Sequence, residues 1–456
     1  HHHSMLASFL TTRRGTPLLT ALCHVPHRRR TISIVTAVDR SVFPTAPWQE
    51  IDKASHFLRA AYPANLPDGA HNAHGATITA LPYDEQSGSL VLPNNHSSQG
   101  GVEQQPWTLD NCEALAIGTR DKPLLKALLA KDTTPRLKWV HCLAAGVDQL
   151  PFEDLQARKA LDPDFLVTHH SDISSVPLAE FSVAGYLHFS KHVSAMQCNF
   201  DQQKYERPPQ QLPPKQISNT TTVGIVGYGS IGRAVAHVCR SGFGMNVIGM
   251  TRTATKHHTN TPPDRSPDRL MASVDMLCNV FADEESQPPP AAPPNKNTTM
   301  LVHTPENLTW LLSQSDLVVL ALPNTSRTDR LLGADELNAM KGDAVLVNVG
   351  RGNAIDEVAL AKALSAPPVA GEVKGLCAAL DVYQTEPLPA SSPLWAVPND
   401  RLLLSPHSAD QTDHYWAETA RVWQDLMAMY LEGEGVGGGV AVLKRNSHVV
   451  DLEEGY

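Results

Sequence analysis

The sequence has few cysteines for its length and no long apolar run. Seven cysteines are scattered over 456 residues, none forms a Cys-x-x-Cys pair, and their number is odd. This pattern indicates buried thiols in a reducing compartment and offers no zinc site, so we expect no metal. No apolar stretch approaches the ~18 residues that span a bilayer, which argues against a membrane protein.

Excess positive charge is also missing. The formal net charge of −10 and the pI of about 6.1 argue against nucleic acid as the main partner. Apolar residues make up 42% of the chain and charged residues 18%, so a large core is possible. A chain of 456 residues is long enough for two or three domains.

Acidic residues are absent from residues 5–38. This segment contains five arginines and several serines and threonines, a composition typical of an organelle transit peptide. We expect residues 1–38 to comprise a tag remnant at 1–4 and a transit peptide, which places the protein in a mitochondrion or chloroplast. The alternatives are a basic disordered tail on a cytoplasmic protein, or a first strand at 32–35 that moves the boundary upstream.

A strand-like apolar run, residues 223–226, leads directly into Gly-x-Gly-x-x-Gly. The residues of this motif that we expect to bind a cofactor are Gly227, Gly229, Ser230, Ile231 and Gly232. The first glycine permits a tight turn, the second lets the backbone approach a pyrophosphate, and the third lets a helix pack on the strand. A helix beginning near Ser230 would direct its N–H groups and positive dipole end at the phosphates. The segment therefore predicts dinucleotide binding.

An acid is missing where the next strand of this unit ends. An NAD enzyme usually has Asp or Glu about 20 residues past the glycines, to bind the ribose 2′-hydroxyl. Here Asn246–Met250 is followed by Thr251, Arg252 and Thr253. Arg252, helped by the hydroxyls of Thr251 and Thr253, suits a 2′-phosphate. We therefore favour NADP(H) over NAD(H).

The rest of the chain alternates strand-like and helical segments, which predicts parallel sheets. Two polar segments interrupt this rhythm, at residues 94–105 and at the proline-rich 254–300. Both are expected to be surface insertions, because repeated prolines fit neither a central strand nor a helix interior. Residues 179–192 predict a helix linking two domains, and residues 413–431 a final long helix.

Three side chains with complementary chemistry each follow an apolar strand-like run. Arg351 can pair with a carboxylate through its bidentate fork. His407 has an intrinsic pKa suited to proton transfer, and a carboxylate at Glu386 would orient it and raise its pKa. Carboxyl ends of strands face the ligand crevice of an open α/β sheet, so these residues are expected to converge there. Reduction of a 2-keto acid needs this set, and the charges of Arg351 and His407 make a metal unnecessary.

The motifs together resemble the D-isomer-specific 2-hydroxyacid dehydrogenase family. They are Gly-Tyr-Gly-Ser-Ile-Gly, Asn-Val-Gly-Arg-Gly, Leu-Asp-Val-Tyr-Gln-Thr-Glu-Pro and Ser-Pro-His-Ser-Ala-Asp. The resemblance implies that Arg351 binds the substrate, that His407 is the acid/base and that Glu386 is its partner. It also implies that Asp381 lies near the nicotinamide. Residues implied to line the cofactor are Leu322, Pro323 and Val349, and those implied to grip the substrate carboxylate through backbone amides are Gly146 and Val147.

The resemblance implies an α/β fold with two doubly wound parallel-sheet lobes. The nucleotide-binding lobe, 184–410, is expected to be inserted into a substrate lobe formed by 39–183 and 411–456, and the protein to be a homodimer. The expected activity is NADPH-dependent reduction of a small 2-keto acid, glyoxylate or hydroxypyruvate, to the D-2-hydroxy acid. The insertion after Arg252 and the first ~110 residues depart from the family pattern, and the Ser-Ala-Asp after His407 resembles a subgroup close to glyoxylate and hydroxypyruvate reductases.

Two other functions use the same fold. A nucleotide-sensing corepressor would bind the cofactor and recruit peptides, and the fold alone does not separate it from an enzyme. Intact Arg351, Glu386 and His407 favour the enzyme. Within enzymes, phosphoglycerate or formate dehydrogenase is the other alternative.

Overall fold

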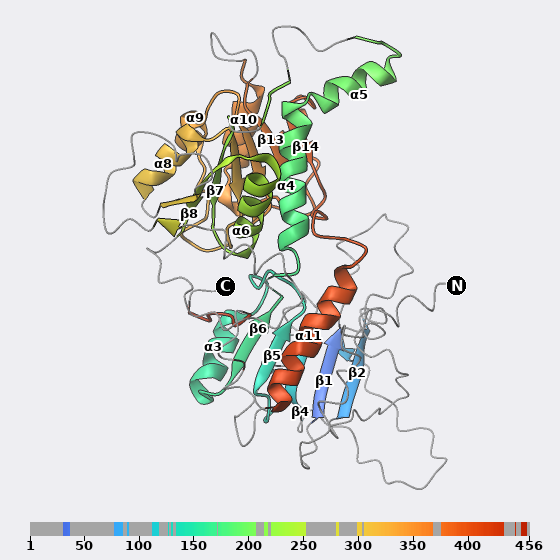
Figure 1. The fold of residues 1–456 in the computed structure, drawn as a ribbon. Coiled ribbons are helices and arrows are strands. Elements are labelled where there is room, and N and C mark those ends of the chain that lie inside the picture. Colours follow the sequence, from blue (N-terminus) through green and yellow to red (C-terminus); the bar gives the residue numbers. More distant parts are fainter. Residues whose placement is uncertain are drawn as a thin grey trace, which may run out of the picture. The chain divides into compact units, whose positions relative to one another are not determined.

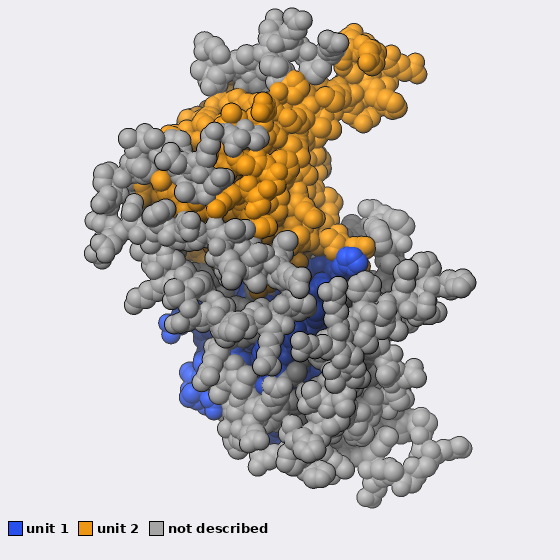
Figure 2. Space-filling view, in the orientation of Figure 1, with its two compact units in different colours: residues 1–171, 414–456 blue, residues 172–413 orange. Residues whose placement is uncertain are grey.

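The computed structural model describes residues 31–36, 77–84, 89–90, 112–117, 126, 129–130, 134–170, 172–206, 214–217, 220–251, 280–281, 299–302, 305–367, 375–432, 443 and 448–453. The chain divides into two compact units, which Figure 2 colours separately. Unit 1 comprises His1–Ser171 and His414–Tyr456, and unit 2 comprises Asp172–Asp413. In the described residues no helix is both long and apolar enough to cross a membrane.

Unit 1 is built on a six-stranded sheet in the order β3-β2-β1-β4-β5-β6 (Figure 1). The strands are β1 Thr31–Thr36, β2 Thr77–Asp84, β3 Ser89–Leu90, β4 Cys112–Ile117, β5 Trp139–Cys142 and β6 Leu166–His169. All pairings are parallel except β2 with β3. The helices among the described residues of this unit are α3 Phe152–Leu161 and α11 Tyr415–Glu432. α11 packs on β5 through Trp423, which stacks on Trp139 at 5.0 Å between ring centroids.

The amino-terminal boundary differs from the one expected at residue 38. Residues Thr31–Thr36 form β1, which pairs in parallel with both β2 and β4, with one register shift against β4 between Thr31 and Ile32. An alternating Thr/Ile/Ser/Ile/Val run satisfies its backbone groups by pairing on both sides. The strand alternative for residues 32–35 is therefore the correct one, and residues 31–36 belong to the fold.

Unit 2 contains an eight-stranded, entirely parallel sheet in the order β14-β13-β12-β11-β7-β8-β10-β9. The strands are β7 Thr222–Val226, β8 Asn246–Met250, β9 Val280–Phe281, β10 Thr299–Val302, β11 Leu317–Leu320, β12 Val345–Asn348, β13 Cys377–Leu380 and β14 Leu402–Leu404. The strand order reverses direction between β7 and β11. In doubly wound sheets ligands bind at this switch point, beyond the carboxyl ends of the strands.

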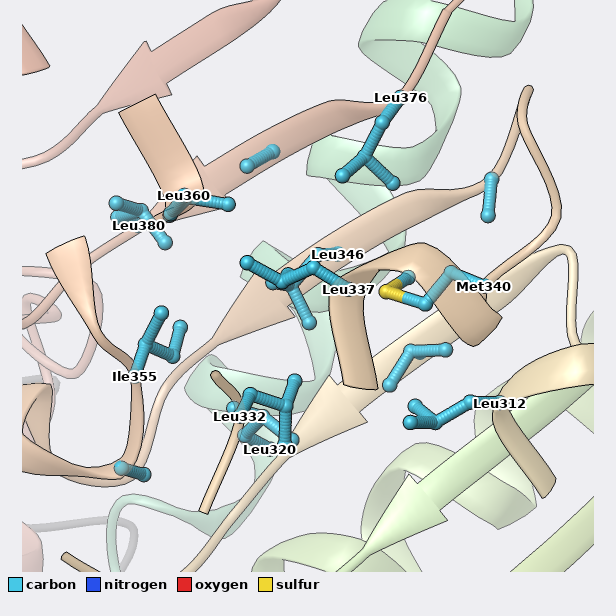
Figure 3. Packing of buried hydrophobic residues seen from close by; sticks show 14 of the residues in the cluster. Leu312, Leu320, Leu332, Leu337, Met340, Leu346, Ile355, Leu360, Leu376 and Leu380 are labelled. Carbon is cyan, nitrogen blue, oxygen red and sulfur yellow. The ribbon is translucent and has the colours of Figure 1, made fainter. Parts of the chain in front are cut away.

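Helices cover both faces of this sheet. The described helices of unit 2 are α4 Ser175–Ser190, α5 Val193–Asp201, α6 Ser230–His237, α8 Pro305–Gln314, α9 Ala334–Ala339 and α10 Glu357–Ser365, with the short helices η6 Val238–Gly242, η7 Gly352–Ala354 and η8 Pro393–Ala396. Of these, α5 has no buried residue and does not cover the sheet. One face packs against α8, α9 and α10 in a leucine-rich cluster that includes Leu320, Leu346 and Leu360 (Figure 3). The other face packs against α4 and α6. Two α/β units with parallel sheets confirm the predicted fold class.

Two expected boundaries change in unit 2. The lobe boundary expected at residue 184 falls inside α4, whose Leu178 and Phe189 are buried in the cluster on the sheet of unit 2. A helix buried along its length is part of one core, so the unit begins at Asp172 and α4 is not a linker. The unit also ends at Asp413 rather than at 410.

The insertion expected at 254–300 is also shorter than predicted. Thr299–Val302 form β10, which pairs with β8, and Val280–Phe281 pair with β10. The remaining residues of that segment, together with 94–105, lie outside the described residues. Among the described cysteines Cys142, Cys239 and Cys377 are buried, but Cys198 on α5 is exposed, contrary to the expectation of buried thiols.

Candidate active site

The loop after β7 has the shape that a dinucleotide requires. Gly227 has a φ of +101°, and a Cβ there would collide with the carbonyl oxygen of Ala321. A Cβ on Gly232 would collide with the carbonyl of Gly227. A Cβ on Gly229 would meet no atom within 4 Å. The first and third glycines are thus fixed by packing, while the second faces open space, as a pyrophosphate in close approach to the backbone requires.

The other expected cofactor residues lie at the same edge of the sheet. Ser230 and Ile231 are the first residues of α6, so their region carries the positive end of the helix dipole. Leu322 and Pro323 follow β11, and Val349 follows β12. Gly350 backs onto Leu322 so closely that a Cβ would strike its backbone. The described residues therefore fit a dinucleotide. Arg252 and Thr253 lie outside the described residues.

The turn that carries Arg351 is held by Asn348, a residue to which the sequence analysis gave no role. The Asn348 Oδ1 accepts from the Gly350 N–H at 3.1 Å, and its Nδ2 donates to the Arg351 carbonyl at 3.0 Å. The Arg351 Nη1 donates to the Gly350 carbonyl at 2.9 Å. Gly352 leaves no room for a Cβ against Tyr383. An amide side chain at the end of an apolar strand-like run was the sequence signal that could have identified Asn348, which is buried in the structure.

His407 and Glu386 form a close pair, as predicted. The Nδ1 of His407 lies 2.6 Å from Oε2 of Glu386. A carboxylate only accepts, so Nδ1 carries the proton and Nε2 is the nitrogen that exchanges one. The Tyr383 N–H donates to the other oxygen, Oε1, at 3.0 Å, which fixes the carboxylate. The side chains are 34% and 27% exposed, so the pair is open to a small ligand.

Several charges act on His407. Burial acts to lower its pKa, but the hydrogen bond and negative charge of Glu386, with the charge of Asp381, outweigh burial. The guanidinium of Arg351 also acts to lower it. The net effect is a raised pKa, which keeps the imidazole protonated to higher pH. His407 therefore responds to the charges of both Glu386 and Arg351, and its direct hydrogen-bond partner among the three is Glu386.

Asp381 has a function in the structure that the sequence did not reveal. It is 2% exposed at the end of β13, and its Oδ1 accepts from the Ser408 N–H at 2.9 Å and the Ala409 N–H at 3.1 Å. His407 itself has a φ of +52°, unusual for a residue with a side chain. Asp381 therefore anchors the backbone just after this turn, and its expected place near the nicotinamide stays a prediction.

In unit 1, Gly146 and Val147 lie in the loop after β5. The Val147 carbonyl accepts from Leu150 at 2.9 Å. Among the residues that the structure describes, none accepts a hydrogen bond from the N–H of Gly146 or Val147. Open successive N–H groups at a turn suit a carboxylate. Within the described ranges no three His, Cys, Asp or Glu side chains gather as a metal cluster.

The geometry thus defines a class: an α/β oxidoreductase with a dinucleotide lobe and a histidine–carboxylate pair. The family model described as "D-isomer specific 2-hydroxyacid dehydrogenase, NAD binding domain" matches residues 183–287 and 289–409. A glyoxylate/hydroxypyruvate reductase B from Escherichia fergusonii is 29% identical over 352 residues, covering 76% of this chain and 90% of the relative. A glyoxylate reductase from Thermofilum pendens is 27% identical, covering 73% and 85%.

Solved structures show the same fold. A D-isomer specific 2-hydroxyacid dehydrogenase from Xanthobacter autotrophicus Py2, in complex with NADPH and MES, has a TM-score of 0.57 at 23% identity and covers 93% of this chain and 99% of its own. A D-lactate dehydrogenase from Aquifex aeolicus, complexed with NAD and lactic acid, has a TM-score of 0.56 at 18% identity, covering 92% and 98%. The chain belongs to the D-isomer-specific 2-hydroxyacid dehydrogenase family and is an NAD(P)-dependent oxidoreductase.

Proposed function

We propose that this protein uses NADPH to reduce a small 2-keto acid, glyoxylate or hydroxypyruvate, to the D-2-hydroxy acid. The observation that carries the proposal is the His407–Glu386 pair, with Arg351 acting on it, in the same unit as an intact dinucleotide loop. The relatives named glyoxylate/hydroxypyruvate reductase support this substrate class.

The residues divide the work by their chemistry. A bound nicotinamide supplies the hydride. His407 gives the proton on its Nε2 to the carbonyl oxygen, while Glu386 holds the Nδ1–H and stabilises the charged imidazole before transfer. Arg351 pairs with the substrate carboxylate and polarises the carbonyl. In unit 1, the open N–H groups of Gly146 and Val147 suit a substrate carboxylate.

The preference for NADPH rests on the residues after β8. No carboxylate follows Met250, and Arg252 offers a guanidinium for a 2′-phosphate. The solved relative from Xanthobacter was obtained with NADPH, and the one from Aquifex with NAD, so the family uses both cofactors. The experiment is a comparison of wild type with Arg252→Ala. We expect the variant to raise KM for NADPH about tenfold or more and to leave KM for NADH nearly unchanged.

The overall proposal is tested by the decay of nicotinamide absorbance with glyoxylate and with hydroxypyruvate, each with NADPH and NADH. Turnover that prefers NADPH supports the proposal. Binding of NADPH without turnover of either acid would contradict it and favour a sensor. The organellar location and the homodimer also stay proposals. A fluorescent fusion of residues 5–30, which end before β1, would test the location, and light scattering of the full chain would test the homodimer.

A further inference from the structure

The end of β6 lies beside the loop that is expected to grip the substrate carboxylate. β5 and β6 are parallel neighbours, with Cys142 opposite His169. The carboxyl ends of parallel strands meet at one edge of the sheet. The loop 143–148 after β5 and the dipeptide His169–His170 at the end of β6 therefore leave the sheet side by side.

Two successive carbonyls of this loop accept hydrogen bonds from the residues at the end of β6. The His169 Nδ1 lies 2.7 Å from the Ala145 carbonyl oxygen. A carbonyl only accepts, so His169 carries a proton on Nδ1 and donates it. The His170 backbone N–H donates to the Ala144 carbonyl at 3.4 Å.

The bond to Ala145 has a consequence for the next residue. The Ala145 carbonyl and the Gly146 N–H belong to one planar trans peptide, in which C=O and N–H point in opposite directions. Holding the Ala145 oxygen on His169 therefore points the Gly146 N–H away from His169. No described residue accepts from that N–H.

The backbone of His169 is fixed in turn by residues near the carboxyl terminus. Its N–H donates to the His448 carbonyl at 2.9 Å, and the His448 Nδ1 donates to the His169 carbonyl at 3.0 Å. The next pair along, Val450 N–H to Val167 carbonyl at 2.9 Å, continues the pairing. His169 is thus a rigid support for the loop, as a group that sets the direction of a donor must be.

We propose that His169 is a positioning residue for substrate binding: through the Ala145 carbonyl it aims the Gly146 N–H at the substrate carboxylate. This inference rests on the proposed function. His169 acts on the bound anion through the loop, and it takes no part in hydride or proton transfer. Its loss should therefore weaken binding of the keto acid and leave the chemical step largely intact.

Three variants separate this function from general destabilisation. His169→Asn places an amide nitrogen close to the position of Nδ1 and can still donate to Ala145, whereas His169→Gln places its amide near the position of Nε2. We expect His169→Ala and His169→Gln to raise KM for glyoxylate about tenfold or more with kcat changed less than threefold, and His169→Asn to stay close to wild type. The Kd for NADPH should not change in any of them.

Gln156→Ala is the matched control. Gln156 donates to the Leu452 carbonyl at 2.6 Å, so this variant loosens the same carboxyl-terminal segment without a contact to the loop. Its KM should equal that of wild type. An unchanged KM in His169→Gln, or an equal rise in His169→Asn and Gln156→Ala, overturns the proposal. The comparison of Asn with Gln decides the matter even if His169→Ala does not fold.

Oxalate binding, measured by calorimetry, separates this inference from the proposed function. If wild type reduces no keto acid yet binds oxalate, the proposed function has failed, and weaker oxalate binding by His169→Gln than by His169→Asn still supports the positioning of Gly146. Equal oxalate binding by the two variants, or no binding by wild type, overturns it.

Discussion

The Ser174 hydroxyl donates a hydrogen bond to Oδ2 of Asp410 at 3.1 Å. Ser174 lies just after the chain enters unit 2 at Asp172, and Asp410 lies just before it leaves at Asp413. The segment where the chain enters unit 2 and the segment where it leaves are thereby joined by a hydrogen bond within that unit. Ser174 is 2% exposed, and burial raises the pKa of Asp410 although the Ser174 bond acts to lower it.

Removing either partner of this bond should destabilise unit 2. We expect Ser174→Ala and Asp410→Ala each to cost about 1–3 kcal/mol, because a buried hydrogen bond to a carboxylate is lost. Urea unfolding of both variants and of the double variant measures this. The double variant should cost less than the sum of the two single costs, since they break one interaction. Strict additivity would show that Ser174 and Asp410 contribute independently.

Replacing His407 should abolish proton transfer and spare the cofactor. We expect His407→Ala to lower kcat for glyoxylate by about 10²- to 10⁴-fold, the usual contribution of a positioned acid/base. Fluorescence titration should give an unchanged Kd for NADPH, because the dinucleotide loop is built from β7 and α6. Near-normal turnover by this variant would contradict the mechanism.

The pH profile should report the Glu386–His407 pair. Keto acid reduction requires protonated His407, so activity is expected below its pKa and is lost as pH rises through it. Glu386 raises that pKa, so Glu386→Gln should move the alkaline limb of kcat/KM to lower pH. Glu153→Gln, an exposed carboxylate on α3, is the control and should leave the limb in place. An identical limb in wild type and Glu386→Gln would exclude His407 as the titrating group.

The glycines of the dinucleotide loop should separate cofactor binding from folding. Gly229→Ala meets no neighbouring atom, so thermal stability without cofactor should change little while NADPH binding weakens at least tenfold. Gly232→Ala collides with the Gly227 carbonyl and should lower stability itself. Thermal unfolding with and without NADPH distinguishes the two. Equal binding by Gly229→Ala and wild type would mean that the pyrophosphate lies elsewhere.

Unit 1 contains a buried chain of hydrogen bonds. Trp139 Nε1 donates to Thr168 Oγ1 at 2.9 Å, and Thr168 Oγ1 lies 2.7 Å from Nδ1 of His141. His141 Nε2 lies 2.8 Å from Nδ1 of His170, whose Nε2 donates to the Thr419 carbonyl on α11 at 2.9 Å. With both histidines neutral, every donor has an acceptor. In the neutral state these hydrogen bonds therefore join β5, β6 and α11.

These buried histidines predict that the folded protein loses stability in acid. Burial lowers the pKa of His170 to about 4, below its ordinary value of 6.5, although backbone carbonyls oppose the shift. The unfolded state then binds a proton that the folded state does not, so stability falls as pH decreases from 6.5 towards 4. We expect His170 to account for about 2 kcal/mol between pH 7 and pH 5. Urea unfolding at both pH values measures it, and His170→Gln should reduce the difference; an equal difference would assign it to other groups.

Much of the fold could be predicted because local patterns are strong where strands are buried on both sides. The apolar runs at β7, β11 and β12 are continuous and short, as parallel strands require. The predicted boundaries were wrong where the composition of the neighbouring segment indicates no strand but backbone pairing forms one. β1 follows an arginine-rich segment that resembles a leader, and only its pairing with β2 and β4 makes it a strand. β10 follows a proline-rich segment for the same reason.

Some residues of the candidate site could likewise be predicted from the sequence, and others could not. Glycines, Arg351, Glu386 and His407 are set by chemistry at strand ends, so a motif can reveal them. Asn348, Asp410 and His169 act by holding backbone or hydroxyl groups of neighbouring turns, and such partners are distant in sequence.

The sequence by itself determined the dinucleotide loop, the histidine–carboxylate pair and the class of chemistry, because these depend on residue types placed directly after strands. The tertiary structure alone decided that α4 belongs to unit 2, that Ser174 binds Asp410, and that His169 supports Ala145. Those contacts join residues far apart along the chain. Only the order and register of the strands bring their ends together, and no local pattern encodes that order.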